Sequence, residues 1–75
     1  MTPYANLNGN SGVRAYQVGT NLIDVQFSDW SVYRYTYSST GANYIEEMKR
    51  LAIAGRGLNS FIGKYVKKNY AAKLR

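Results

Sequence analysis

Residues 30–37, WSVYRYTY, decide the fold of this chain because they predict a central strand whose two faces differ. Aromatic and β-branched residues fill the run, and such residues fit the pleated surface of a β-sheet. Side chains alternate along a strand, so Tyr33, Tyr35 and Tyr37 share one face and Arg34 lies on the other. We therefore expect a strand that extends through about Tyr37.

The length of the turn after Phe27 determines which face of this strand is buried. An odd-length loop puts the tyrosines on the same side of the sheet as Val25, whereas an even-length loop puts Arg34 there. Burying a lone arginine is costly and burying tyrosine rings is favourable, so we expect the odd loop. The tyrosines are then mainly core, with their hydroxyls toward its rim, and Arg34 pairs across the strands with Asp24. An exposed stacking platform for bases is the alternative for the tyrosines.

Two further strands are predicted before this run. Residues 13–18 and 22–27 have strand composition, and residues 19–21, which contain a glycine, form a short hairpin loop between them. Residues 1–12 are rich in asparagine and glycine, so we expect a flexible N-terminal segment there. We expect residues 13–75 to form a single domain, because a chain of 75 residues is near the lower size limit for one domain that folds without disulfides or metals.

Two helices are predicted after the strands. Residues 38–41, SSTG, break the third strand and offer N-cap oxygens, and a helix then runs to about Ala54. Residues 55–57, GRG, end that helix, and apolar residues recur at spacings of three and four over residues 58–69. The order β-β-β-α-α predicts an α+β fold, a three-stranded antiparallel β-meander followed by two helices packed on one face.

The composition argues against several classes of function. The chain has no cysteine and no histidine, which removes disulfides, thiolate or imidazole metal sites and the usual base of nucleophilic triads. Glu46 and Glu47 are adjacent, so they point in different directions on a helix and form no acid/base pair. We therefore expect no enzyme activity, no metal and no cofactor. A small domain without cysteine suits the cytoplasm, and neither a membrane span nor a signal segment is expected.

The net charge of +6 is unevenly distributed along the chain. Residues 1–48 carry two arginines and four acidic residues, whereas residues 49–75 carry eight basic residues and no acid. Segregation of this kind predicts a positive surface on the helical half that attracts phosphates or an acidic protein surface. The alternative is a solvated helix surface that keeps a small protein soluble.

Three parts of the sequence are candidates for binding. Trp30 occupies a hairpin tip, where it is either folded over the core or exposed as a contact residue. Arg56 lies between two glycines before the second helix, an arrangement that either holds a phosphate or makes a tight connection with positive φ. Lysines follow on one side of that helix and could neutralise several phosphates. The candidate nucleic-acid- or partner-binding residues are Trp30, Arg56, Asn59, Lys64, Lys67, Lys68 and Lys73.

Several short motifs in order resemble the KTSC domain, a small module found at the C-terminus of some lysyl-tRNA synthetases and as stand-alone bacterial and phage proteins. They are residues 23–27 (IDVQF), Tyr33-Arg34-Tyr35, residues 55–62 (GRGLNSFI) and Leu74. The resemblance covers roughly residues 11–75. It implies that the Tyr-Arg-Tyr triplet is a structural family motif and that the module binds RNA, as has been suggested for that family.

The chain departs from the family pattern at three places. Asp29-Trp30 stands where the turn is usually Asn-Gly, and Ser38-Ser39-Thr40 replaces a proline that commonly follows the third strand. Gly63 stands where a basic residue commonly follows the isoleucine of the second helix, and Lys64 comes one position later. A family anion contact is therefore not carried over to position 63.

The sequence as a whole predicts a small non-catalytic binding module. Its expected ligand is nucleic acid, RNA rather than DNA, held on the basic helical half with Trp30 adding a contact. The alternative is a protein-interaction module that recognises an acidic protein surface, such as a phage-encoded inhibitor or adaptor of a host system. A third hypothesis is capture of a small nucleotide by the glycine-containing loop at Arg56.

Overall fold

The computed structural model describes residues 1–9 and 11–75 of the chain. The strands in this part are β1 (Thr2–Pro3), β2 (Val13–Val18), β3 (Leu22–Phe27), β4 (Val32–Thr36) and β5 (Ala72–Lys73). The helical elements are α1 (Tyr37–Thr40), α2 (Ala42–Ala54), α3 (Leu58–Phe61) and a π-helical turn, η1 (Ile62–Val66).

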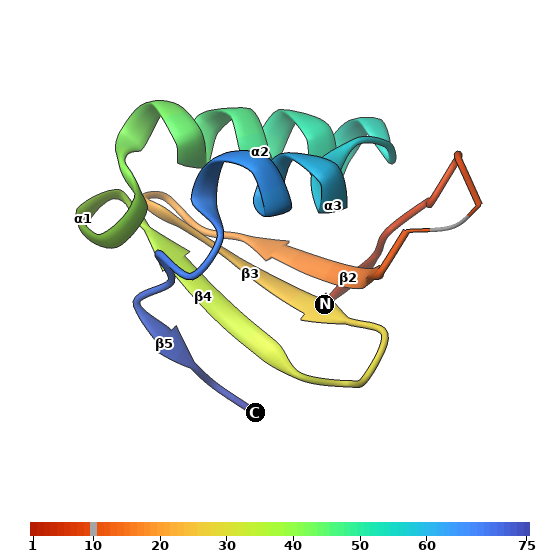
Figure 1. Cartoon of the computed structure of the whole chain (residues 1–75), viewed down its shortest axis with the longest axis horizontal. Coiled ribbons are helices and arrows are strands. Elements are labelled where there is room, and N and C mark those ends of the chain that lie inside the picture. The colour runs from red at the N-terminus through yellow and green to blue at the C-terminus, as the bar shows by residue number, and fades with distance from the viewer. Residues whose placement is uncertain (10) are drawn as a thin grey trace.

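The strands form one antiparallel sheet in the order β1-β2-β3-β4-β5. Helices α2 and α3 and the turn η1 lie across one face of this sheet, and in the described residues no helix lies on the other face (Figure 1). The predicted α+β class, with helices on one face, is confirmed. The sheet is wider than predicted, because the expected three-stranded meander corresponds to β2, β3 and β4 alone.

The two edge strands extend the sheet beyond the prediction. β1 pairs Thr2 with Tyr16 of β2, and β5 pairs Lys73 with Tyr33 of β4. Tyr4 follows β1 into the core, where its hydroxyl accepts a hydrogen bond from the Leu58 N–H at 3.3 Å. The predicted domain, residues 13–75, therefore leaves out β1, which belongs to the sheet, and Tyr4, which belongs to the core. Part of the expected flexible segment, residue 10, lies outside the described residues.

The hairpin between β3 and β4 has the odd-length loop that was predicted. The N–H of Phe27 donates to the carbonyl of Ser31 at 2.9 Å, which leaves three residues, 28–30, in the loop. Trp30 has a φ of 73°, the left-handed conformation that completes a three-residue hairpin loop. Val25 therefore lies opposite Tyr33 on the face that the helices cover.

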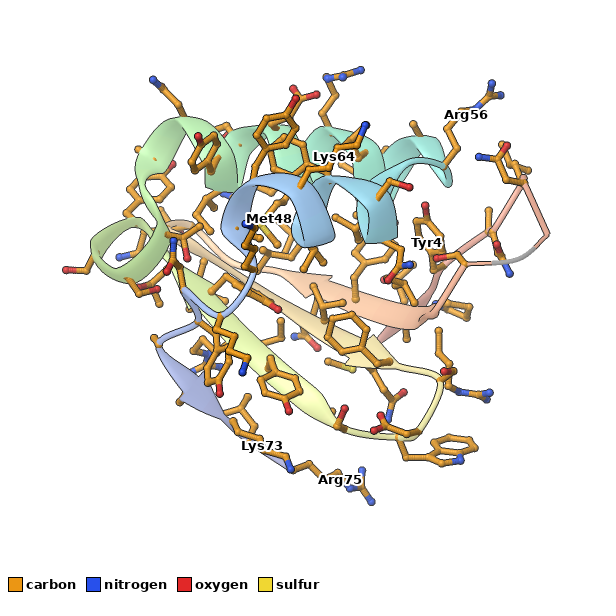
Figure 2. The ribbon with its side chains drawn as sticks, in the orientation of Figure 1. Tyr4, Met48, Arg56, Lys64, Lys73 and Arg75 are labelled. Carbon is orange, nitrogen blue, oxygen red and sulfur yellow. The ribbon has the colours of Figure 1, made fainter. Side chains whose placement is uncertain are left out.

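The core lies between the sheet and the helical layer, where Tyr4 and Met48 point toward each other's layer (Figure 2). The prediction that the strand tyrosines are mainly core is confirmed for Tyr35, which is 2% exposed, whereas Tyr33 is half-buried. It is wrong for Tyr37, because β4 ends at Thr36 and Tyr37 starts α1 with its hydroxyl donating to Glu46. The side chains that fill the core are Tyr4, Val13, Ile23, Val25, Tyr35, Ile45, Met48, Ala52, Leu58, Ile62 and Val66.

Helix α1 occupies the segment that was expected to be an irregular break. The Thr36 hydroxyl accepts from the Ser39 N–H, and the Ser39 hydroxyl accepts from the Thr36 N–H, each at 3.1 Å. This reciprocal capping box supports a helical turn that has no periodic apolar pattern of its own. Gly41, with a φ of 107°, then redirects the chain into α2, which ends at Ala54 as predicted.

The second predicted helix is shorter than its apolar spacing suggested. Helix α3 passes into η1, and the helical hydrogen bonds end where the Lys67 N–H donates to the Ile62 carbonyl at 2.6 Å. Lys67 has a φ of 46° and a ψ of −116°, which no helix continues. Asn69 therefore lies outside the helix, and the chain turns back to run beside β4. Within the described residues no helix is long and apolar enough to cross a membrane.

Candidate functional site

Most acidic side chains are already paired with basic ones. The ion pairs are Arg34–Asp24 at 2.8 Å, Lys49–Glu46 at 2.9 Å and Arg50–Glu47. The Arg34–Asp24 pair has two hydrogen bonds and confirms the predicted cross-strand partner of Arg34. Within the described residues, the cations outside these ion pairs are Arg14, Arg56, Lys64, Lys67, Lys68, Lys73 and Arg75. The surplus positive charge of the molecule therefore resides on these seven side chains.

A groove of about 220 Å³ lies between the end of η1 and the sheet. We call it the aromatic groove; its lining residues are Phe27, Tyr33, Tyr35, Ile62, Lys67, Lys68 and Tyr70. Tyr70 is part of the lining because its ring packs edge-on against two strand tyrosines. The ring centroids of Tyr70 and Tyr33 are 4.6 Å apart, and those of Tyr70 and Tyr35 are 6.3 Å apart. Two of the predicted binding residues, Lys67 and Lys68, therefore lie next to a cluster of aromatic rings.

Lys73 connects the aromatic groove to the hairpin tip. It lies opposite Tyr33 in the β4–β5 pair, and its ammonium nitrogen is 5.9 Å from the centre of the Tyr33 ring. Lys73 also lines a shallow hollow together with Trp30 and Arg75. The Trp30 side chain is 58% exposed, so the ring is a surface residue rather than a cover for the core.

The Trp30 ring carries a further cation. The guanidinium carbon of Arg14 lies 3.8 Å from the ring centre, a cation–π contact. Lys73 lines the hollow, and its ammonium group lies over the Tyr33 ring that lines the groove, so this side chain links the two. We call the surface made by the groove, the hollow and Arg14 the basic strip. Its members are Arg14, Trp30, Tyr33, Lys67, Lys68, Tyr70, Lys73 and Arg75.

One acidic residue, Asp29, borders the strip in the hollow beside Trp30. Its carboxylate accepts hydrogen bonds from the Ser31 hydroxyl at 2.6 Å and from the Ser31 N–H at 3.1 Å. These bonds lower the pKa of Asp29, so the carboxylate is charged at neutral pH. Asp29 therefore stabilises the turn and offsets one of the positive charges of the strip.

Two members of the strip have strained backbones. The described non-glycine residues with a positive φ are Asn6, Trp30 and Lys67. Asparagine tolerates this conformation, but a tryptophan or lysine there costs the fold free energy that a glycine would save. Strain of this kind gathers at functional sites, and both residues are candidates that the sequence had singled out.

The remaining predicted residues lie elsewhere. Figure 2 shows Arg56 and Lys64 projecting from the helical layer, whereas Lys73 and Arg75 lie at the β5 edge on the other side of the molecule. The single basic helical surface that was predicted is therefore divided into two. Arg56 and Asn59 line a separate polar pocket of about 220 Å³ with residues of the N-terminal segment. Gly55 and Gly57 have φ values of 79° and 81°, as expected for a tight connection between helices.

Sequence reasoning missed two members of the strip as binding residues. Tyr70 lies after the end of η1 and outside any periodic pattern, and Arg14 is a single basic residue in β2. Only the folded arrangement brings them to Lys73 and Trp30. In the described residues no group of three acidic, histidine or cysteine side chains is placed to hold a metal ion. What the strip offers chemically is fixed positive charge next to accessible aromatic rings.

The comparisons with known proteins returned no match: no family model, no curated protein and no solved structure matches this chain. The resemblance to the KTSC domain therefore stays a prediction, which rests on the motifs around Tyr33-Arg34-Tyr35 and residues 55–62.

Proposed function

We propose that this chain is a small non-catalytic module of the cytoplasm that binds nucleic acid along the basic strip, RNA in preference to duplex DNA. One observation carries the proposal: along the strip, basic side chains that form no ion pair alternate with accessible aromatic rings. They run from Lys67 and Lys68 through Tyr33 and Lys73 to Trp30. Lysine and arginine neutralise phosphates, and aromatic rings stack on bases. A surface that interleaves both is typical of proteins that follow a nucleic-acid backbone.

The preference for RNA follows from where the rings lie. Bases in a duplex are paired and stacked, so they reach side chains only by their edges. RNA more often presents loops and ends whose bases are free to stack on protein rings. The strip has rings at both of its ends, in the groove at Tyr33 and at the hairpin tip at Trp30.

The test compares charge reversal on the strip with charge reversal on the helical layer. The double variant Lys67→Glu/Lys68→Glu reverses two charges on the strip, and Lys64→Glu reverses one on the helical layer. We expect the double variant to lose binding to a short single-stranded RNA by a factor of 10 or more at roughly 0.1 M salt. We expect Lys64→Glu to bind within about twofold of the unmodified protein. Fluorescence anisotropy of labelled RNA measures both, and equal losses for both surfaces, or no RNA binding at low salt, would contradict the proposal.

A second candidate function is binding of a protein partner, which one feature of the helical layer favours. The rings of Tyr44, Phe61 and Tyr65 pack together on α2, α3 and η1, and the tyrosines are 41% and 53% exposed. Exposed aromatic clusters are frequent anchors of protein interfaces. Capture of partners from a nuclease-treated lysate separates the two functions, since a protein retained by the unmodified chain and lost in Tyr65→Ala supports this candidate. Loss of all bound material on nuclease treatment supports the first.

A further inference from the structure

The aromatic groove differs from the hollow at Trp30 because most of its lining is aromatic and includes a buried ring, Tyr35. Tyr35 lies at its buried end and is 2% exposed, whereas Tyr33 and Tyr70 are half-buried and form its sides. Phe27 extends the wall, with its ring edge-on to Tyr33 at a centroid distance of 5.8 Å. Its volume of about 220 Å³ is below the roughly 300–1,000 Å³ of pockets for drug-sized ligands, so it suits a single planar ring system.

The groove also presents hydrogen-bonding groups that the protein itself does not use. In the described part of the chain, the hydroxyls of Tyr33, Tyr35 and Tyr70 form no hydrogen bond to other residues. No buried side-chain oxygen or nitrogen there lacks a partner, so these hydroxyls reach solvent. Burial raises the pKa of Tyr35 to about 12, and its hydroxyl therefore keeps its proton at neutral pH. Each hydroxyl can donate to or accept from the edge of a ligand.

The mouth of the groove is positively charged on both sides. Lys67 and Lys68 line it at the end of η1, and Lys73 lies over Tyr33 at the sheet edge. A ligand that fills the groove with a ring and carries a negative charge outside it matches this arrangement. The strained backbone of Lys67 fixes the turn from which these two lysines extend.

We infer that the aromatic groove holds one unpaired base of a single-stranded nucleic acid against the touching rings of Tyr33 and Tyr70, with the adjoining phosphate on Lys67 and Lys68. This inference rests on the proposed function and specifies it. A base within a duplex cannot enter the groove unless it leaves the stack, which costs free energy. The groove therefore makes the module selective for single strands, although a duplex has the higher charge density and would be favoured by the cations alone.

The inference is tested by comparing an oligouridylate with the same strand paired to an oligoadenylate, at one salt concentration. We expect the single strand to bind about tenfold more tightly than the duplex. Tyr70→Leu removes one wall of the groove and should lower affinity for the single strand about tenfold, leaving the duplex unchanged. Tyr65→Leu is the matched control, since Tyr65 is 53% exposed and lies outside the groove, and it should change neither affinity.

A second measurement on the unmodified protein guards against a folding defect in Tyr70→Leu. Carbon-detected aromatic resonances of Tyr33 and Tyr70 should shift when the oligouridylate binds, and those of Tyr44 and Tyr65 should not. If the single strand binds but these resonances stay in place, or if the duplex binds equally well, the inference fails while the proposed function stands. If neither nucleic acid binds in a salt-dependent manner, the proposed function itself fails.

Discussion

The substitution Lys67→Gly should make the protein more stable and a weaker binder. Lys67 has a φ of 46° and a ψ of −116°, a conformation that is sparsely populated for any residue with a side chain. Holding such a conformation costs about 1–3 kcal/mol, and glycine avoids most of this cost. Glycine has more conformational freedom in the unfolded chain, which returns about 0.5–1 kcal/mol. The lysine side chain is exposed, so little packing is lost. The net expectation is a gain of about 1 kcal/mol in the free energy of unfolding.

The same substitution removes one cation from the mouth of the aromatic groove. The loss of one phosphate contact weakens binding to a single strand about fivefold at roughly 0.1 M salt. Stability and affinity should therefore change in opposite directions, as expected if the chain keeps a lysine in a position that suits glycine for the sake of binding.

Denaturant unfolding and fluorescence anisotropy measure the two effects. Lys68→Gly is the matched control, because Lys68 also lines the groove but does not have a positive φ. It should lose a similar factor in affinity without any gain in stability. The reasoning would be refuted if Lys67→Gly destabilised the protein, or if it bound single-stranded RNA as tightly as the unmodified chain.

Three further predictions concern the turn, the core and the open face of the sheet. Trp30→Gly should keep the free energy of unfolding within about 1 kcal/mol of the unmodified protein, because glycine relieves the strain at a φ of 73° and this offsets the lost contact with Arg14. Its affinity for RNA, measured by fluorescence anisotropy, should fall about fivefold or more, and an unchanged affinity would contradict the prediction. Tyr35 is neutral in the fold with a pKa raised to about 12, so its stabilising contribution is present below about pH 10 and is lost as the pH rises toward 12. Tyrosinate absorbance should show an ionisation step at about pH 12 that Tyr35→Phe removes, whereas the raised pKa of Tyr37, caused by its hydrogen bond to Glu46, should stay. A single step near pH 10 for all tyrosines would disprove the prediction for Tyr35. Arg34→Met should lower the melting temperature more than Arg50→Met, because only the loss of Arg34 leaves a buried carboxylate, that of Asp24, without its partner. Equal decreases in the melting temperature of the two variants would count against this prediction.

The central part of the fold is predictable because two independent constraints agree on it. The alternation in β3 and β4 defines two faces, and the cost of burying Arg34 decides which face meets the helices. The edge strands are a different matter, since β1 and β5 are two residues long and have no period to detect. Their pairing depends on contacts made by the rest of the fold, such as the seating of Tyr4 against Leu58.

The candidate site was predictable as a set of residue types but not as a surface. The apolar spacing after Leu58 predicted a long helix, which would have put all the lysines on one side. The π-helical turn instead ends at Val66, so Lys67 and Lys68 turn toward the sheet and Lys64 stays on the helical layer. The reversal of the chain after Lys68 could not be read from local pattern, because it depends on the pairing of β5 with β4.

The salt dependence of binding tests the central claim most directly. The unmodified protein should bind a short single-stranded RNA with a slope of about −3 in the logarithm of affinity against the logarithm of salt concentration, as expected for four or five phosphate contacts. Lys67→Glu/Lys68→Glu should reduce this slope to about half, and Lys64→Glu should leave it unchanged. A slope near zero for the unmodified protein, or the same slope in all three proteins, would contradict nucleic-acid binding on the basic strip.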